Sequence, residues 1–335
     1  MTLLSVWHPA LLRRCAPGIA LAAVVALSAT FIADSYGGPQ LLYALFFGLA
    51  FHFLAHDPVC QPGIDWCSRT LLRTGVALLG LRITLGDIGA LGAAPLLMVV
   101  VAVATTLGFG WLLARRLGRP ASEGWLSGGA VGICGASAAL AIAAVLPQTK
   151  ENEKFTLLVV VGVTTLSTVA MIMYPLLVQL LGLAPGAAGI FLGGTIHDVA
   201  QVVGAGYLIS PQAGDVATVV KLTRVACLVP VVLGLTLLFH SGSGRTAVRT
   251  QPLMPVFLIG FVWCVLANSF DLIPQAVAAS LLQASRACLV MAIAALGVKT
   301  SFQALAALGW RPVVLLVAET VWLAGFVLIA LIFIN

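Results

Sequence analysis

The sequence GGTIHDVAQVVGAG, residues 193–206, interrupts an apolar stretch that runs over about 185–212. A second apolar stretch, about 121–148, is interrupted in the same way by GGAVGICGASAAL, residues 128–140. Glycine-rich, polar sequence in the middle of an apolar run predicts a broken helix. Bare backbone amides are costly in hydrocarbon, so such a break is tolerated only where it is buried in protein or lines a cavity. These two segments therefore decide the fold and the place of a candidate site.

The rest of the chain has the composition of a membrane protein. Of 335 residues, 61% are hydrophobic and 8% are charged, whereas soluble domains carry roughly 25% charged residues. So few charges cannot cover a domain in water, which excludes a soluble enzyme, a secreted domain and a nucleic-acid-binding protein. The net charge of +6 comes from basic residues in short polar gaps between apolar runs. That pattern is typical of loops that face anionic lipid and the cytoplasm.

Uninterrupted apolar runs long enough to cross a bilayer, which takes about 20 residues, recur along the chain. They lie at about 17–35, 39–56, 70–86, 95–115, 155–181, 216–239, 253–270, 276–298 and 312–334. Together with the two broken segments they predict an all-α polytopic membrane protein of about 9 to 11 transmembrane helices, with residues 1–335 forming one transporter domain. The first run lacks a clean cleavage site, so we expect a retained helix rather than a signal peptide.

Internal similarity suggests repeats. Residues 76–97 match residues 293–314, and the broken segment that ends at Pro147 matches more weakly the one that ends at Pro211. A cytoplasmic N-terminus would place most arginine-rich gaps inside. In that orientation, re-entrant hairpins would make both pairs of matching segments inverted repeats, with halves at about 39–182 and 183–335. Single discontinuous spans would instead leave the weaker pair parallel. Hairpins are the more coherent interpretation. Inverted repeats with broken helices are typical of secondary transporters.

The two breaks predict an anion site. A half-helix that begins near Gly135 would present the Cys134 thiol and the Ser137 hydroxyl, and one that begins near Thr195 would precede His197. Helix N-termini carry about half a positive charge and several free N–H donors, so two that converge favour an anion. Close helix packing is the alternative role for such glycines. The candidate substrate-binding residues are Gly132, Cys134, Gly135, Ser137, Gly193, Gly194, Thr195, Gln201, Lys221 and Arg224.

Lys221 and Arg224 stand within the apolar run VATVVKLTRVACLVPVV, residues 216–232. Three residues apart, they share one helix face. An ionised side chain in the bilayer centre costs about 2.5 kcal/mol or more and usually faces a partner or an aqueous path. We therefore expect these cations to set the anion preference. Two alternatives stay open: Asp198 neutralises one of them, or Lys221 reaches the membrane surface.

Three residues are candidates for ion coupling. His197 titrates near neutrality and therefore suits proton coupling, while its neighbour Asp198 could carry the proton or simply cap a half-helix. Glu319, within the last apolar run, could also carry a proton, or be a hydrogen-bonded packing residue. The coupling ion is thus H⁺, or Na⁺ if Asp198, Gln201 and carbonyls at the breaks bind it in an uptake carrier.

Enzyme signatures are weak. The sequence holds no HExxH, P-loop or GxGxxG motif, and its seven cysteines are scattered, so we expect no cofactor, no metal and no enzyme activity. The one enzymatic alternative is a membrane-embedded hydrolase with Ser137 or Cys134 as nucleophile and His197 as base. A passive channel is a further alternative.

Four segments resemble the YeiH-type sulfate exporter family of bacterial inner-membrane proteins. They are GICGASAAL (132–140), GGTIHDVAQVVGAGYLIS (193–210), VVKLTRVACLVP (219–230) and ALGVKTSFQALAALGWRP (295–312). The resemblance runs from about residue 17 to the end of the chain, and the second and third segments are the specific ones. It implies a multi-pass secondary carrier of the inner membrane that exports sulfate or a related organosulfur anion. We thus predict a secondary active transporter that couples the movement of a small anion to protons, with a homo-oligomer as one alternative for its assembly.

Overall fold

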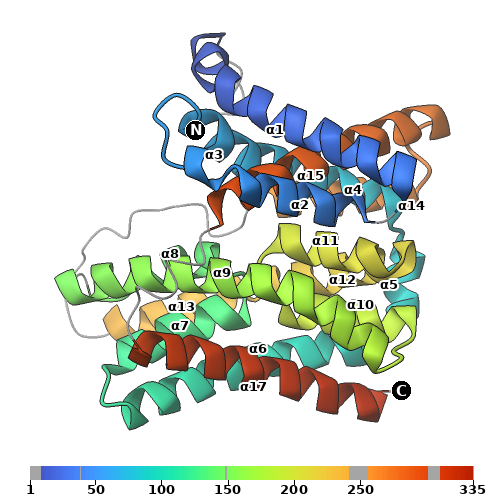
Figure 1. Cartoon of the computed structure of the whole chain (residues 1–335). Coiled ribbons are helices and arrows are strands. Elements are labelled where there is room, and N and C mark those ends of the chain that lie inside the picture. Colours follow the sequence, from blue (N-terminus) through green and yellow to red (C-terminus); the bar gives the residue numbers. More distant parts are fainter. Residues whose placement is uncertain (1–8, 38, 148, 241–255, 301–309, 335) are drawn as a thin grey trace. The chain divides into compact units, whose positions relative to one another are not determined.

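The computed structural model describes residues 9–37, 39–147, 149–240, 256–300 and 310–334, in which all regular structure is helical (Figure 1). The predicted all-α class is therefore confirmed. The chain forms two compact units, each drawn from two stretches of sequence. Unit 1 lies within Met1–Gly86 and Phe257–Ser301, and unit 2 within Asp87–Val256 and Phe302–Asn335.

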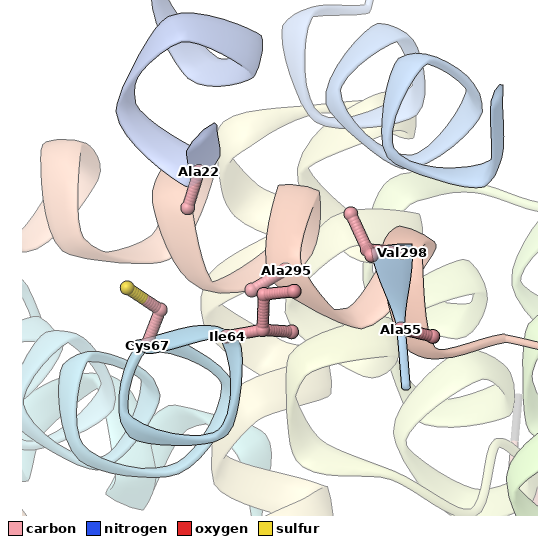
Figure 2. Close-up of a cluster of buried hydrophobic side chains, with 6 residues drawn as sticks. All are labelled: Ala22, Ala55, Ile64, Cys67, Ala295 and Val298. Carbon is pink, nitrogen blue, oxygen red and sulfur yellow. The ribbon is translucent and has the colours of Figure 1, made fainter. Parts of the chain in front are cut away.

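Unit 1 is a cluster of helices around a core of small and branched side chains. Its elements are α1 (Pro9–Tyr36), α2 (Gln40–Ala50), η2 (His52–Leu54), α3 (Gln61–Trp66), η3 (Cys67–Leu71), α4 (Leu72–Leu79), η4 (Gly80–Arg82), α14 (Val256–Ser269) and α15 (Gln275–Lys299). Figure 2 shows part of the core, where Ile64 and Cys67 meet Ala295 and Val298 of α15. Small residues allow this close approach: a Cβ on Gly297 would lie 3.0 Å from Gly48 Cα on α2.

Unit 2 contains both broken segments. Its elements are α6 (Ala93–Arg116), α7 (Ala121–Gly132), α8 (Ala136–Ala143), α9 (Lys150–Leu180), α10 (Pro185–Thr195), α11 (Val199–Ile209), α12 (Pro211–Ala226), α13 (Leu228–His240) and α17 (Trp310–Ile334), while α5 (Leu85–Leu91) crosses the boundary between the units. The long helices α6 and α17 lie side by side and both contact α7 (Figure 1). They form the packed surroundings of the first break.

The spans are fewer than predicted. Within the described residues, six helices are long and apolar enough to cross a membrane, or seven if Gln61–Arg82 and Leu85–Leu91 count as one bent span. The predicted runs 39–56 and 253–270 yield only the shorter helices α2 and α14, of 11 and 14 residues. In the first case α2 ends at Ala50, yet the apolar residues Phe51, Phe53 and Leu54 extend the hydropathy signal through a turn. Residues 253–255 lie outside the described ranges.

The first broken segment is a helical hairpin, here hairpin 1 (α7 and α8). A Cβ on Gly129 of α7 would meet the side chain of Ile142 of α8, and one on Gly128 would lie 2.9 Å from the Thr106 carbonyl oxygen of α6. If α8 continued in line with α7, Ile142 would lie about 20 Å beyond Gly129, at 1.5 Å per residue. The two half-helices therefore fold back on each other.

The second broken segment, hairpin 2 (α10 and α11), folds back in the same way. A Cβ on Gly189 would lie 2.7 Å from Val216 Cβ, and one on Gly193 would lie 2.9 Å from Val220 Cβ, so α10 runs parallel to α12. Helix α11 runs antiparallel to α12, because the two are joined at Ser210 and Gly206 approaches Gly214. Helices α10 and α11 are thus antiparallel, as the hairpin interpretation predicts. The inverted repeat stays a prediction, and part of its second copy, residues 301–309, lies outside the described ranges.

Candidate functional site

The tips of the two hairpins face each other inside unit 2. Hairpin 1 breaks at Ile133–Gly135, where Gly135 takes φ +66°, a conformation that glycine adopts without strain. Hairpin 2 breaks at Ile196–Asp198. A Cβ on Gly135 would lie 3.6 Å from His197 Cβ. The structure therefore brings the predicted tip residues together.

Lys221 reaches both tips from α12. Its side chain is fully buried, and Nζ donates to the Ile133 carbonyl oxygen at 2.7 Å and to the Ile196 carbonyl oxygen at 3.0 Å. The alternative in which Lys221 extends to the membrane surface is therefore wrong. The reason is that both half-helix C-termini offer acceptors within its reach.

Arg224, one turn along α12 and also fully buried, binds the same two breaks. Nε and Nη2 donate to the carbonyl oxygens of Gly132 and Val131 at 2.8 and 2.7 Å. Nη1 donates to the carbonyl oxygens of Gly193 and Ile196 at 3.2 and 3.0 Å. The last carbonyls of a helix lack partners within it, so Arg224 supplies donors where α7 and α10 end.

Both cations thus bind helix C-termini, and the Asp198 side chain caps the helix that follows the second break. Asp198 Oδ1 accepts from the Ala200 amide at 2.8 Å, and the Asp198 amide donates to Ser167 Oγ of α9 at 2.9 Å. Asp198 thus N-caps α11, one of the roles expected for this residue, and the neutralisation of a cation by its carboxylate stays a prediction. The cap fixes where α11 begins, and the hydrogen bond to Ser167 holds the tip of hairpin 2 on α9.

Two other tip residues make one hydrogen bond each. His197 Nε2 lies 3.1 Å from Thr320 Oγ1 of α17, and Gln201 Nε2 donates to Thr168 Oγ1 of α9 at 2.8 Å. His197 Nδ1 and Gln201 Oε1 are buried with no hydrogen-bond partner in the part of the chain that the structure describes. Unsatisfied buried polar atoms are rare and costly, so these two mark a place where a proton, water or ligand can bind.

Glu319 of α17 lies against hairpin 1. It is fully buried, its Oε1 accepts from Ser127 Oγ at 2.7 Å, and Oε2 has no partner among the described residues. A Cβ on Gly110 of α6 would collide with Oε1. Gly110 and Ser127 therefore form a fitted recess for one carboxyl group. Both roles expected for Glu319, packing and proton transfer, remain compatible with this recess.

The glycines at the tips pack closely as well. A Cβ on Gly193 would meet the Ala217 carbonyl of α12, one on Gly194 would lie 3.3 Å from Val327 Cγ1, and one on Gly132 3.4 Å from Thr106 Cβ. The hydroxyl of Thr195 donates to the Phe191 carbonyl at 2.6 Å within its own helix. These residues shape the tips through packing, and any contact with substrate stays a prediction.

Ser137 does not join the cluster. Cys134 is buried at the break of hairpin 1, whereas Ser137 is exposed on α8. No hydrogen bond joins Ser137 to His197 in the described ranges, where the His197 ring contacts Thr320 instead. The hydrolase alternative with Ser137 as nucleophile therefore lacks the contact with the base that it requires, while the form with Cys134 stays an alternative. The sequence could not predict which face of α8 carries Ser137, because the neighbouring residues are alanines.

Sequence reasoning missed the hydroxyl partners of the site. Ser127, Ser167, Thr168 and Thr320 each bind a predicted site residue. It also missed Glu123, which is buried at the start of α7 and pairs with Arg119 at 2.6 and 2.7 Å. The spacing of four residues between Arg119 and Glu123 was a usable signal. The hydroxyl residues gave none, because serine and threonine are common in membrane helices.

Comparison with known proteins places the chain in a family. The family model described as Conserved hypothetical protein 698 matches residues 17–316. A UPF0324 membrane protein from Chlorobaculum tepidum is 53% identical over 94% of this chain and 88% of its own length. UPF0324 membrane protein TauZ from Paracoccus pantotrophus is 48% identical over 95% of each chain. UPF0324 inner membrane protein YeiH from Salmonella typhi is 31% identical over 92% of this chain and 90% of its own.

No solved structure gives a significant match. The names of these relatives describe membrane proteins, in agreement with the apolar helices of this chain. The resemblance to YeiH drawn from the sequence is confirmed. The chain therefore belongs to the family described as Conserved hypothetical protein 698, whose relatives named here are UPF0324 membrane proteins.

Proposed function

We propose that this protein is a secondary active transporter that moves a small anion, sulfate or a related organosulfur anion, across the bacterial inner membrane together with a proton. The observation that carries the proposal is the joining of two facing re-entrant hairpins by the buried Lys221 and Arg224. Re-entrant or broken helices that meet inside the protein form the substrate sites of many carriers. Sulfate itself is supported by the family resemblance rather than by the geometry.

The charge balance of the tips favours an anion. Lys221 and Arg224 bring two positive charges, while the C-termini of α7 and α10 together contribute about one negative charge. The N-termini of α8 and α11 contribute about one positive charge, which the Asp198 carboxylate offsets. An excess of about one positive charge remains in a buried place, and a bound anion would neutralise it.

The same geometry disfavours the sodium-coupled alternative. A sodium site at the tips would need free carbonyl oxygens, but Lys221 and Arg224 already occupy those of Val131, Gly132, Ile133, Gly193 and Ile196. A cation placed beside two other cations is also electrostatically unfavourable. Protons are therefore the coupling ion that we propose.

His197 is the proposed proton acceptor beside the substrate. Glu319 belongs to α17, the helix that contacts His197, and is a second group that can hold a proton. A carrier that moves a dianion with one proton transfers one net negative charge. An inside-negative potential of 100 mV drives that charge outward by about 2.3 kcal/mol. Export is thus consistent with this stoichiometry. A cytoplasmic N-terminus is part of the same proposal.

Flux measurements in proteoliposomes test the proposal. The purified protein should carry labelled sulfate, and Lys221→Met and Arg224→Gln should each lower that flux at least tenfold. Lys154→Met, at an exposed position on α9, is the matched control and should transport normally. Full sulfate flux in both buried variants would overturn the proposal. Flux that follows a sodium gradient and ignores pH would favour the alternative carrier.

A further inference from the structure

The His197 ring has one satisfied nitrogen and one bare nitrogen. The side chain is fully buried, and its Nε2 lies 3.1 Å from Thr320 Oγ1. Its Nδ1 has no hydrogen-bond partner in the described part of the chain. A neutral imidazole carries a single N–H, so the Thr320 contact decides which nitrogen holds it.

The direction of that hydrogen bond follows from the backbone of α17. A threonine hydroxyl has one proton to donate, and Thr320 Oγ1 donates it to the Leu316 carbonyl oxygen at 2.7 Å. The hydroxyl oxygen is then available to His197 only as an acceptor. With the hydroxyl proton in that bond, His197 carries its hydrogen on Nε2, and the lone pair of Nδ1 has no partner among the described residues.

We propose that Thr320 is a positioning residue that fixes the Nε2–H tautomer of His197, so that the coupling proton binds at Nδ1. This inference rests on the proposed transport function and assigns its proton to one atom. No covalent bond changes in the step: the proton adds to the Nδ1 lone pair, and the ring becomes an imidazolium with both nitrogens protonated.

Charged and titratable groups surround this ring on every side. Lys221 and Arg224 of α12 bind the carbonyl of the preceding residue, Ile196. The remaining groups are Asp198 at the start of α11, Cys134 at the tip of hairpin 1, Glu319 next to Thr320 in the sequence of α17, and Tyr174 of α9, whose ring packs at a tilt against Phe191 of α10. The two cations oppose an imidazolium in the empty site.

A bound dianion reverses that balance. It neutralises the excess positive charge at the tips, so that protonation of Nδ1 and anion binding favour each other. By thermodynamic linkage, the anion then raises proton affinity by the same factor by which the proton raises anion affinity. Thr320 contributes by keeping Nδ1, rather than Nε2, as the open position.

The tautomer is measured directly by ¹⁵N NMR of histidine-labelled protein in liposomes, with His197→Gln used to assign the signal among the five histidines. Wild-type protein at high pH should show Nε2 protonated and Nδ1 bare. Thr320→Val removes the acceptor, so that neither nitrogen has a partner and the signal should change to that of a mixture of the two tautomers, whereas Thr320→Ser should restore the wild-type signal. Thr218→Val is the matched control, because Thr218 is also fully buried and donates to the Gly214 carbonyl at 2.7 Å.

The pH profile of sulfate flux provides a second readout. In Thr320→Val both forms of the ring lose the Thr320 acceptor, and the loss is larger for the imidazolium, because a charged N–H makes the stronger hydrogen bond. Protonation is thus weakened about tenfold, the size that one buried hydrogen bond supports, and the midpoint of the profile should move to lower pH by about one unit. Thr320→Ser and Thr218→Val should keep the wild-type midpoint.

The outcomes separate this inference from the proposed function. Wild-type protein with Nδ1 protonated and Nε2 bare would overturn the inference whatever the flux, as would Thr320→Val with a wild-type NMR signal. Protein that shows the Nε2–H tautomer but carries no sulfate would overturn the transport proposal and leave the assignment of the tautomer standing.

Discussion

Lys221 and Arg224 lie one turn apart on α12, and each donates hydrogen bonds to backbone carbonyls of both hairpins. One helix thus donates hydrogen bonds to the C-terminal carbonyls of two half-helices that lie far apart in the sequence. Buried carbonyls without donors are costly, so each cation stabilises both breaks at once. The arrangement also keeps both basic side chains at the tips, where we propose that the anion binds.

Arg224→Lys should destabilise the protein even though the charge is retained. A lysine has a shorter reach and cannot reproduce a guanidinium with four donor contacts on four carbonyls. We expect a loss of about 3 kcal/mol, because at least two carbonyls lose a charged donor. Thermal unfolding in detergent measures the loss, with Lys154→Ala on the surface as the control. A melting temperature equal to that of the wild type would show that the carbonyl contacts contribute little.

Gly193→Ala should disturb the packing of hairpin 2 on α12. The added Cβ would collide with the Ala217 carbonyl and lie 2.9 Å from Val220 Cβ. Overpacking of this kind costs about 1–3 kcal/mol. Gly186→Ala is the matched control on the same helix, because no heavy atom lies within 4 Å of its Cβ position. If both variants unfold at the same temperature, α10 and α12 are not packed this closely.

Gly135→Ala should combine a backbone cost with a functional effect. Gly135 has φ +66°, and Gly118 in the turn after α6 has φ +68°. Alanine is strained at a positive φ, and at Gly135 the ψ of −128° lies in a region essentially restricted to glycine, where strain of about 1–3 kcal/mol is expected. Gly135→Ala and Gly118→Ala should therefore both lose stability, while only the first lowers sulfate flux, because only it adds a methyl group 3.6 Å from His197 Cβ. Equal fluxes in the two variants would remove the tip of hairpin 1 from the site.

Asp198→Asn should retain stability and transport. Asparagine caps helices about as well as aspartate, whereas Asp198→Ala should lose about 1 kcal/mol with the cap. The capping contact to the Ala200 amide needs an acceptor oxygen but no charge. Sulfate flux and melting temperature of the two variants decide the matter. Loss of flux in Asp198→Asn at wild-type stability would instead mean that the carboxylate itself binds an ion.

The sequence was sufficient to predict the helical membrane fold, the two breaks and their hairpin form. Glycine, polar residues and apolar runs report on backbone and solvent, and those determine where a membrane helix can break. The partners of Lys221 and Arg224 could not be predicted, because backbone carbonyls are the same in every residue. The shorter helix α2 was missed for a related reason: Phe51 is apolar whether it lies in a helix or in a turn.

Glu319→Gln should separate the two roles of this buried carboxyl group. Glutamine has nearly the same shape as a protonated glutamate, so its amide can fill the recess formed by Gly110 and Ser127. A buried carboxylate without a counter-charge is costly, and Glu319 Oε2 has no hydrogen-bond partner among the described residues. The neutral variant should therefore match wild-type stability to within about 1 kcal/mol. If Glu319 exchanges the coupling proton, Glu319→Gln should still exchange labelled for unlabelled sulfate across the membrane but lose accumulation driven by a pH gradient. Accumulation at the wild-type level would instead make Glu319 a packing residue, with His197 left as the proposed proton-binding group at the tips.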